Sequence, residues 1–302
     1  MTLRYNAGEL ITAMVTPFNK DYSVDYESLE KITKYLIEEQ NNDAIVVAGT
    51  TGESPTLTHE EEQEILYCVK SINSGRVKII MGAGSNCTDT AVKSSIKAQE
   101  LGADAILSVV PYYNKPNQQG IIEHFSTIAK SVDIPIILYN IQGRTGVDMT
   151  PSTIAFLAKE FENIIAVKQS NANLDLISEI KMLAPDGFAV YSGDDSLTLP
   201  MLSIGAHGVV SVASHVAGNE IKSMIHNFKA GQIEASSNMH RILYPLFKKI
   251  FMAPNPVPIK ALLSKMGLIQ NCVRKPLVGL GEQERLELLE CLNSIKQTTK
   301  QP

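Results

Sequence analysis

Eight short apolar runs, rich in β-branched residues, recur along the 302-residue chain. They lack the alternation of apolar and polar residues that marks a strand with one wet face, as expected of strands buried on both faces. The stretches between them carry apolar residues at helical spacing, and alternating strands and helices imply a parallel sheet. The runs are ITAMV from residue 11, AIVVA from 44, KIIMG from 78, AILSVV from 105, IPIILY from 134, IIAVK from 164, FAVYS from 188 and GVVSV from 208.

Eight strand–helix repeats close naturally into a barrel, which uses about 250 residues as one unit. An open doubly wound sheet would usually show a glycine-rich dinucleotide turn after its first strand, whereas here the first run continues into TPFNKDYS. We therefore predict an α/β fold, a (β/α)8 TIM barrel with a C-terminal helical extension. We expect the barrel over residues 1–230 and a helical bundle over 231–302, whose pattern is broken by the prolines of APNPVPIK at 253–260.

Capping residues predict where helices begin. Thr58 followed by Glu61 forms a capping box, in which each side chain satisfies a backbone N–H group of the other residue. Thr150 before Pro151 predicts a second start, because proline loses no hydrogen bond at the first helical position. We expect the aspartates of SGDDS at 192–196 to cap the helix after the seventh run rather than to line a site.

Net charge and hydropathy indicate which kinds of molecule this protein does not bind. The net charge of −5 comes from acidic and basic residues mixed along the chain, without the basic stripe that nucleic-acid binding requires. No apolar run approaches the roughly 18 residues that span a bilayer, and the N-terminal segment does not resemble a secretion signal. We expect a cytoplasmic protein that binds neither nucleic acid nor membrane.

The cysteines and histidines form no metal-binding pattern. The four cysteines lie far apart without a CxxC pair, so we expect reduced thiols. The six histidines are equally scattered, and no HExxH motif appears. We expect no catalytic metal, and we assign no catalytic role to His59, His207 or His215.

Active sites of such barrels lie at the C-terminal ends of the strands, so polar residues that end an apolar run deserve inspection. The sixth run places Lys168 at its end, after four apolar residues. Burial disfavours the ammonium form and can turn a lysine into a nucleophile for carbonyl groups. The alternative is a lysine whose apolar stem leads its amine out to solvent.

The fifth run ends in Tyr139 and continues as YNIQGRTG, which brings Arg144 toward the same edge of the barrel. A phenol near an imine can shuttle protons, and a guanidinium offers a planar fork for a substrate carboxylate. Taken alone, a tyrosine at a strand end and a surface arginine fit these positions equally well.

Two further loops carry polar side chains. GTTGES at 49–54 follows the second run, and its turn presents the hydroxyls of Thr50 and Thr51 and backbone N–H groups suited to a carboxylate. Similar clusters occur in plain loops. PYYNKP follows the fourth run with Tyr112 and Tyr113, and paired exposed tyrosines are typical of interfaces.

The motifs GTTGES, PYYNKP, YNxxxRTG and the lysine of AVKQS occur here in the order and at the strand ends found in one family. The chain resembles the dihydrodipicolinate synthase family from TPF at 16–18 to NPVPIK at 255–260. The resemblance implies 4-hydroxy-tetrahydrodipicolinate synthase activity, which condenses pyruvate with L-aspartate 4-semialdehyde in the diaminopimelate and lysine pathway. Covalent catalysis through a lysine imine would need neither a metal nor an organic cofactor.

The resemblance also assigns catalytic roles. Lys168 would attack the ketone of pyruvate, and Tyr139 would be the acid/base residue. Thr50 and Tyr113 would complete a proton relay to solvent. In the family the tyrosine matching Tyr113 comes from a neighbouring subunit, which implies at least a dimer and commonly a homotetramer of two tight dimers.

The same resemblance assigns the binding residues. Thr51 would hold the pyruvate carboxylate and Arg144 the carboxylate of the aldehyde, and the backbone around Val210 would contact the imine. The loop usually reads YNxPxRTG, but here Gln142 replaces the proline, so the backbone that aims Arg144 would be less rigid.

A second departure concerns regulation. Members of the family that are inhibited by lysine bind it at the dimer interface, and His59, Asn86 and Tyr112 match that site. Glu62 replaces a histidine there and Thr90 an acidic residue. Because loss of the acid weakens binding of a cationic amino acid, we predict little inhibition by lysine.

Two other readings compete. Another pyruvate-dependent aldolase or lyase, such as N-acetylneuraminate lyase or a 2-keto-3-deoxy sugar acid aldolase, would share Lys168 and Tyr139, and Gln169 also occurs in sialic acid lyases. Those enzymes generally lack the arginine, so Arg144 favours the synthase. A barrel that only senses ligands would have no need to keep Lys168, Tyr139, Thr50 and Tyr113 together.

Overall fold

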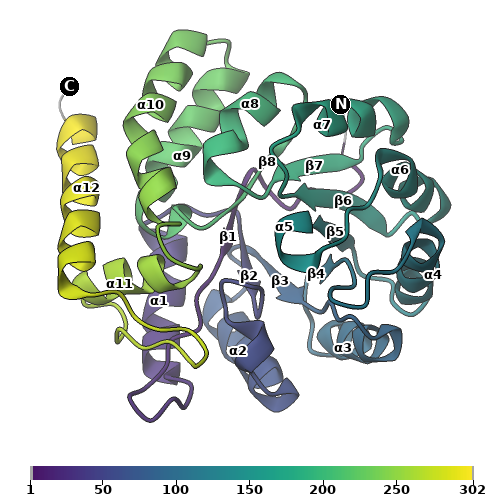
Figure 1. Cartoon of the computed structure of the whole chain (residues 1–302), viewed down its shortest axis with the longest axis horizontal. Coiled ribbons are helices and arrows are strands. Elements are labelled where there is room, and N and C mark those ends of the chain that lie inside the picture. Colours follow the sequence, from purple (N-terminus) through teal and green to yellow (C-terminus); the bar gives the residue numbers. More distant parts are fainter. Residues whose placement is uncertain (1–2, 301–302) are drawn as a thin grey trace.

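The computed structural model describes residues 3–300 and contains a closed barrel of eight parallel strands. Each strand pairs with the next in chain order, and β8 pairs with β1, as Figure 1 shows around the ring of labels. All eight predicted runs form strands, so the predicted barrel is confirmed. The strands are β1 Leu10–Ala13, β2 Ala44–Val47, β3 Lys78–Gly82, β4 Ala105–Val109, β5 Ile136–Asn140, β6 Ile164–Gln169, β7 Ala189–Ser192 and β8 Gly208–Ser211.

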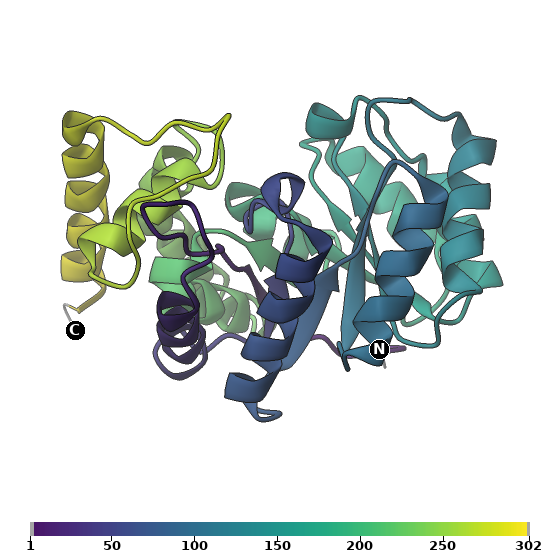
Figure 2. The ribbon, with the colours of Figure 1, turned by 90° about the horizontal axis from the view of Figure 1, so that it is seen from below.

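Helices cover the outside of the barrel (Figures 1 and 2). Up to α9, one helix follows each strand except β5, which is followed by both α5 and α6, and three more helices follow α9. The helices are α1 Tyr26–Glu38, α2 His59–Asn73, α3 Thr88–Glu100, α4 Gln118–Ala129, α5 Gln142–Thr145, α6 Pro151–Glu160, α7 Leu174–Leu183, α8 Thr198–Ser203, α9 Ser214–Lys229, α10 Ile233–Lys249, α11 Val257–Lys265 and α12 Glu282–Lys300, with short 3₁₀ turns η1 Ser54–Thr56 and η2 Asp195–Leu197.

The core has two parts, because successive side chains of a strand point to opposite faces. Outward residues pack under the helices, while a second buried cluster fills the barrel. The interior cluster includes Ile11, Ala13, Val46, Ile80, Ala105, Leu107, Ile137, Ala166, Ala189 and Val210. Tyr191 is fully buried in it, and its hydroxyl donates to the Gly8 carbonyl at 2.9 Å. The interior is therefore packed, which leaves the strand ends for chemistry.

The predicted helix starts are confirmed, and the predicted aspartate cap is wrong. Thr58 and Glu61 form the capping box of α2, and the Thr150 side chain accepts from Thr153 at the start of α6. Neither aspartate of SGDDS caps its own helix. Asp195 is buried and accepts instead from the Ser211 hydroxyl and from N–H groups just before α9. The buried Asp195 carboxylate therefore has its hydrogen-bond donors from residues 16 to 18 positions away.

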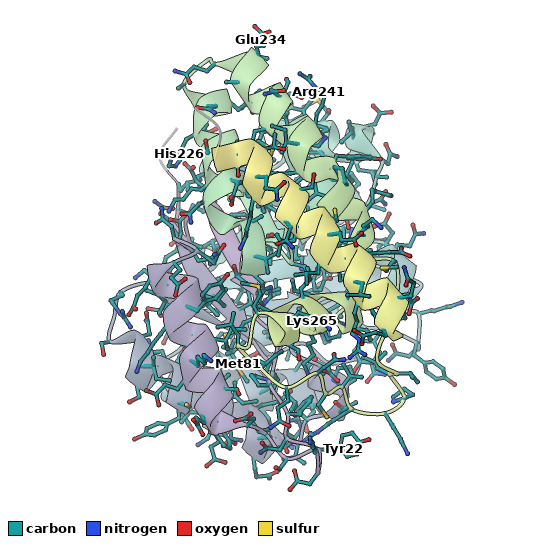
Figure 3. All side chains as sticks on the ribbon, turned by 90° about the vertical axis from the view of Figure 1, so that its left-hand side faces the viewer. Tyr22, Met81, His226, Glu234, Arg241 and Lys265 are labelled. Carbon is teal, nitrogen blue, oxygen red and sulfur yellow. The ribbon has the colours of Figure 1, made fainter. Side chains whose placement is uncertain are left out.

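The C-terminal extension lies at one side of the barrel (Figure 2). Figure 3 shows α12 lying across α10 and α11, with Arg241 beside the far end of α12 and Lys265 near its start. The predicted boundary at residue 230 falls between α9 and α10, and the prolines of 253–260 separate α10 from α11. The division into two domains stays a prediction. Across residues 3–300, no helix is both long and apolar enough to cross a membrane.

Candidate active site

Lys168 and Tyr139 lie side by side on neighbouring strands, near the C-terminal ends of β6 and β5. They are register partners, and each side chain is only 6% exposed. The Lys168 Nζ lies 4.2 Å from the centroid of the Tyr139 ring. An amine held against an aromatic face inside a barrel is not a lysine that reaches out to solvent.

The loop after β7 forms another wall beside Lys168. A Cβ on Gly193 would lie 3.1 Å from the Lys168 Cε and 1.8 Å from the Ser170 Oγ, so only glycine fits there. Burial raises the pKa of the neighbouring Asp194, and the positive charges of Lys168 and Lys248 oppose that rise. Lys168 is therefore closely surrounded and has a carboxyl group nearby.

The GTTGES turn after β2 is held by several buried hydrogen bonds. Thr51 is 3% exposed and its hydroxyl accepts a hydrogen bond of 2.9 Å from the Asn255 Nδ2. The Thr16 hydroxyl donates to the Gly52 carbonyl at 2.7 Å. Glu53 closes the turn with a left-handed φ of 57°, a conformation that side chains other than glycine rarely adopt. Surrounding contacts must hold it there.

Those contacts include an ion pair buried between the turn and α11. The Lys260 Nζ lies 2.5 Å from the Glu53 Oε1, and the two side chains are 0% and 2% exposed. The Arg274 backbone N–H donates to the Glu53 Oε2 at 2.9 Å. Burial lowers the pKa of Lys260, and Glu53 opposes that shift. Both carboxylate oxygens therefore have partners from the C-terminal extension.

Arg144 and Tyr113 lie farther out, in loops that touch each other. Arg144 is exposed in the last turn of α5, and Tyr113 is 88% exposed with a left-handed φ of 73°. The Tyr113 N–H donates to the Thr145 carbonyl at 3.3 Å. Within residues 3–300 neither side chain makes a hydrogen bond or an ion pair.

The segment that carries Arg144 keeps its backbone hydrogen bonds with Gln142 in place of proline. This glutamine occupies the first position of α5, and the N–H groups of Arg144 and Thr145 both donate to the Ile141 carbonyl at 3.1 Å. The Gly146 N–H donates to the Gln142 carbonyl at 2.9 Å. The first helical N–H has no partner inside a helix whichever residue is there, so the turn forms without the proline.

A family model agrees with this geometry. The model of the Dihydrodipicolinate synthetase family matches residues 6–295. The chain belongs to the dihydrodipicolinate synthetase family. Across the described residues, no group of three or more His, Cys, Asp or Glu side chains could hold a metal ion. Members of this family are lyases of the class I aldolase type, which form the bond to substrate through an amine.

Relatives within the dihydrodipicolinate synthetase family match over nearly their whole length. A 4-hydroxy-tetrahydrodipicolinate synthase 1 of Halalkalibacterium halodurans is 48% identical over 95% of this chain and 97% of its own. The corresponding synthase of Bacillus subtilis is 46% identical over 96% of this chain and 100% of its own.

Solved structures of the family agree as closely. A crystal structure of DHDPS from Cyanidioschyzon merolae with lysine bound superposes with a TM-score of 0.94 at 44% identity, covering 96% of this chain and 98% of that one. A structure described as the first monomeric dihydrodipicolinate synthase variant gives 0.92 at 37% identity, over 95% and 97%. That description makes a multimer the usual state of the family.

Sequence reasoning found Lys168 and Tyr139 but missed the residues behind the GTTGES turn. Asn255 and Lys260 lie more than 200 residues after that turn, in a segment that the sequence did not predict to contact the site. One signal was available in NPVPIK, because a lysine within an apolar stretch that is buried needs a carboxylate partner.

Proposed function

We propose that this chain condenses pyruvate with L-aspartate 4-semialdehyde, the reaction of a 4-hydroxy-tetrahydrodipicolinate synthase. The observation that carries the proposal is the buried contact between Lys168 and Tyr139 at the strand ends of a family barrel. The amine of Lys168 attacks the pyruvate ketone, and the oxygen leaves as water to give an imine. Loss of a methyl proton gives an enamine, whose carbon adds to the aldehyde.

Tyr139 lies beside the amine at which the proton transfers of imine formation take place. Its ring lies against the Lys168 amine, so its hydroxyl can pass a proton to the departing oxygen and recover one later. Thr50, in the turn after β2, and Tyr113 continue the relay to solvent. An 88% exposed tyrosine held in a left-handed conformation supports donation of Tyr113 to a neighbouring subunit, within a homotetramer built as a dimer of dimers.

The two carboxylates of the substrates have separate partners. Thr51 binds that of pyruvate inside the barrel, and Arg144, exposed on α5, binds that of the aldehyde near the opening. Val210 lies inside the barrel on β8, 1% exposed, and its backbone borders the imine. Pyruvate is thus held by a buried residue and the aldehyde by an exposed one. This fits the order of the reaction, because pyruvate must be bound before the aldehyde arrives.

The decisive experiment couples turnover of both substrates to dihydrodipicolinate reductase and follows the loss of NADPH absorbance. Borohydride reduction with pyruvate alone should attach a pyruvyl group to Lys168, located by peptide mass mapping. Lys260 serves as an internal control, because it is also buried but bound to Glu53. Turnover with labelling of Lys168 supports the proposal, and labelling of Lys260 or of no lysine contradicts it.

A pyruvate-dependent lyase of sugar acids is the second candidate. The Ser170 Oγ is buried without a hydrogen-bond partner in the described structure and lies against Gly193, which adjoins Lys168. A free hydroxyl there suits a hydroxylated substrate, and Gln169 follows the lysine as in sialic acid lyases. Lys168 labelling without turnover of aspartate 4-semialdehyde, together with cleavage of N-acetylneuraminate or of a 2-keto-3-deoxy sugar acid, would favour this candidate.

A further inference from the structure

One side chain of the C-terminal extension contacts Thr51 directly. Asn255 lies in the loop between α10 and α11, and its Nδ2 donates to the Thr51 Oγ1 at 2.9 Å. The two residues are 204 positions apart in sequence, and their side chains are 8% and 3% exposed. A contact so buried and so distant along the chain is made by the fold and not by local backbone geometry.

The direction of this hydrogen bond decides what Thr51 can do. A hydroxyl has a single proton to donate and two lone pairs that accept. The amide of Asn255 occupies one lone pair, and within residues 3–300 the Thr51 hydroxyl donates to no other group. Its proton therefore stays available to an acceptor that enters the barrel, and a carboxylate is the strongest acceptor that a small substrate offers.

The backbone of the turn is held from the same side. Lys260 and the Arg274 N–H bind the two oxygens of Glu53, and the Glu53 N–H donates to the Thr50 carbonyl at 3.1 Å. The Arg274 guanidinium reaches onward to Glu61 in the first turn of α2. Glu53 is thus tied to the extension directly, and Thr50 is tied to it through one hydrogen bond to Glu53.

We infer that the C-terminal extension is a working part of the pyruvate site, in which Asn255 is a positioning residue that aims the Thr51 proton at the pyruvate carboxylate. This inference rests on the proposed function. The ion pair of Glu53 and Lys260 keeps the turn in the conformation that makes this possible. Binding of pyruvate, more than binding of the aldehyde, therefore depends on Asn255.

Asn255→Asp tests the inference with almost no change of shape. A carboxylate oxygen in place of the amide accepts the Thr51 proton and turns it away from the substrate. We expect the KM for pyruvate to rise about ten- to hundredfold, while the KM for aspartate 4-semialdehyde changes less than about twofold. The matched control is Asn73→Asp, because Asn73 is fully buried and doubly hydrogen-bonded to Val77 behind β3. The control should lower stability and leave both KM values unchanged.

A double-mutant cycle distinguishes orientation of the Thr51 hydroxyl by Asn255 from a packing role of the Asn255 side chain. Asn255→Leu should raise the KM for pyruvate in the wild-type background, and should add almost nothing once Thr51→Val has removed the hydroxyl. Additive effects of the two substitutions would overturn the inference. If Asn255→Asp does not fold by circular dichroism, the uncharged Asn255→Leu carries the test alone.

Borohydride trapping distinguishes failure of the proposed function from failure of the inference about Asn255. If the wild type forms no pyruvyl adduct at any pyruvate concentration, both the proposed function and the inference fail. If the wild type is trapped and Asn255→Asp is trapped at the same half-saturating pyruvate concentration, only the inference fails. A half-saturating concentration that rises with the KM for pyruvate supports it.

Discussion

The Lys168 Nζ lies over the ring of Tyr139, 4.2 Å from its centroid, and the two residues are register partners on adjacent parallel strands. Sheet pairing therefore sets their separation, so no loop has to close to bring amine and phenol together. The ring and the hydroxyl of Tyr139 have different roles in this arrangement. The ring supports the lysine stem and its charge, while the hydroxyl handles protons.

Tyr139→Phe separates these two roles, because it keeps the ring under Lys168 and removes the hydroxyl. We expect kcat to fall about 10²- to 10⁴-fold, as is typical when a general acid/base is lost. The KM for pyruvate should change little, since the packing remains. Steady-state kinetics measures both, with the thermal midpoint as a check on folding. A variant that keeps more than about a tenth of the wild-type kcat would remove Tyr139 from the proton path.

Gln142→Pro should stabilise the protein by about 0.5–1 kcal/mol, because proline at the first position of α5 restricts the unfolded chain without costing a hydrogen bond. Ile141 already has an extended φ of −144° and a ψ of 78°, outside the helical region that a following proline disfavours. Urea unfolding would measure the gain. Gly143→Pro is the control, since it would force helical Gln142 out of its conformation and should destabilise. A loss of stability in Gln142→Pro would contradict this account.

The order of strands and the lysine at the end of β6 could be predicted because both depend on local signals. Each of the eight runs is buried on both faces, so its composition alone marks it, and Lys168 interrupts one of them at its end. Asp195 could not be assigned in this way. Its partners Val212 and Ala213 lie 17 and 18 positions away and are brought to it by the pairing of β7 with β8.

The structure of the Arg144 segment and of the GTTGES turn depends on contacts that the identity of the neighbouring residues does not reveal. The missing proline at Gln142 suggested a looser loop, yet α5 is held by backbone hydrogen bonds that any residue can make. Conversely, nothing local in GTTGES indicates that Asn255 and Lys260 bind it. Long-range polar contacts carry no periodicity, so they appear only when the chain is folded.

Micromolar lysine should leave the activity essentially unchanged. His59, Glu62 and Thr90 line a cavity of about 330 Å³ between α2 and α3, whose wall also contains Lys93 and Lys97. Thr90 is uncharged and so offers a cationic ligand no opposite charge, while the two ammonium groups are paired with Asp89 and Glu100. Initial rates across a lysine titration test this. Thr90→Glu should bring measurable lysine binding by calorimetry and its isosteric control Thr90→Gln should not, whereas strong inhibition of the wild type would contradict the prediction.

Acid should destabilise the fold through buried histidines, and His124 is the clearest case. Burial lowers the pKa of His124 from 6.5 to about 4. Its Nδ1 lies 2.9 Å from the Thr88 Oγ1, and its buried Nε2 has no hydrogen-bond partner within the described part of the chain. Protonation would therefore leave a charged N–H group in an apolar site without an acceptor.

The lowered pKa of His124 determines whether acid raises or lowers the free energy of unfolding. Because the pKa of His124 is lower in the folded state, its contribution is fully present above pH 6.5 and is lost as the pH falls toward 4. Between pH 7.5 and pH 5 the loss should be on the order of 2 kcal/mol for this residue. His124→Asn can keep the contact with Thr88 but cannot titrate, so the free energy of unfolding should fall less steeply over this range. Parallel pH dependences of wild type and variant, measured by urea unfolding, would show that His124 is not responsible.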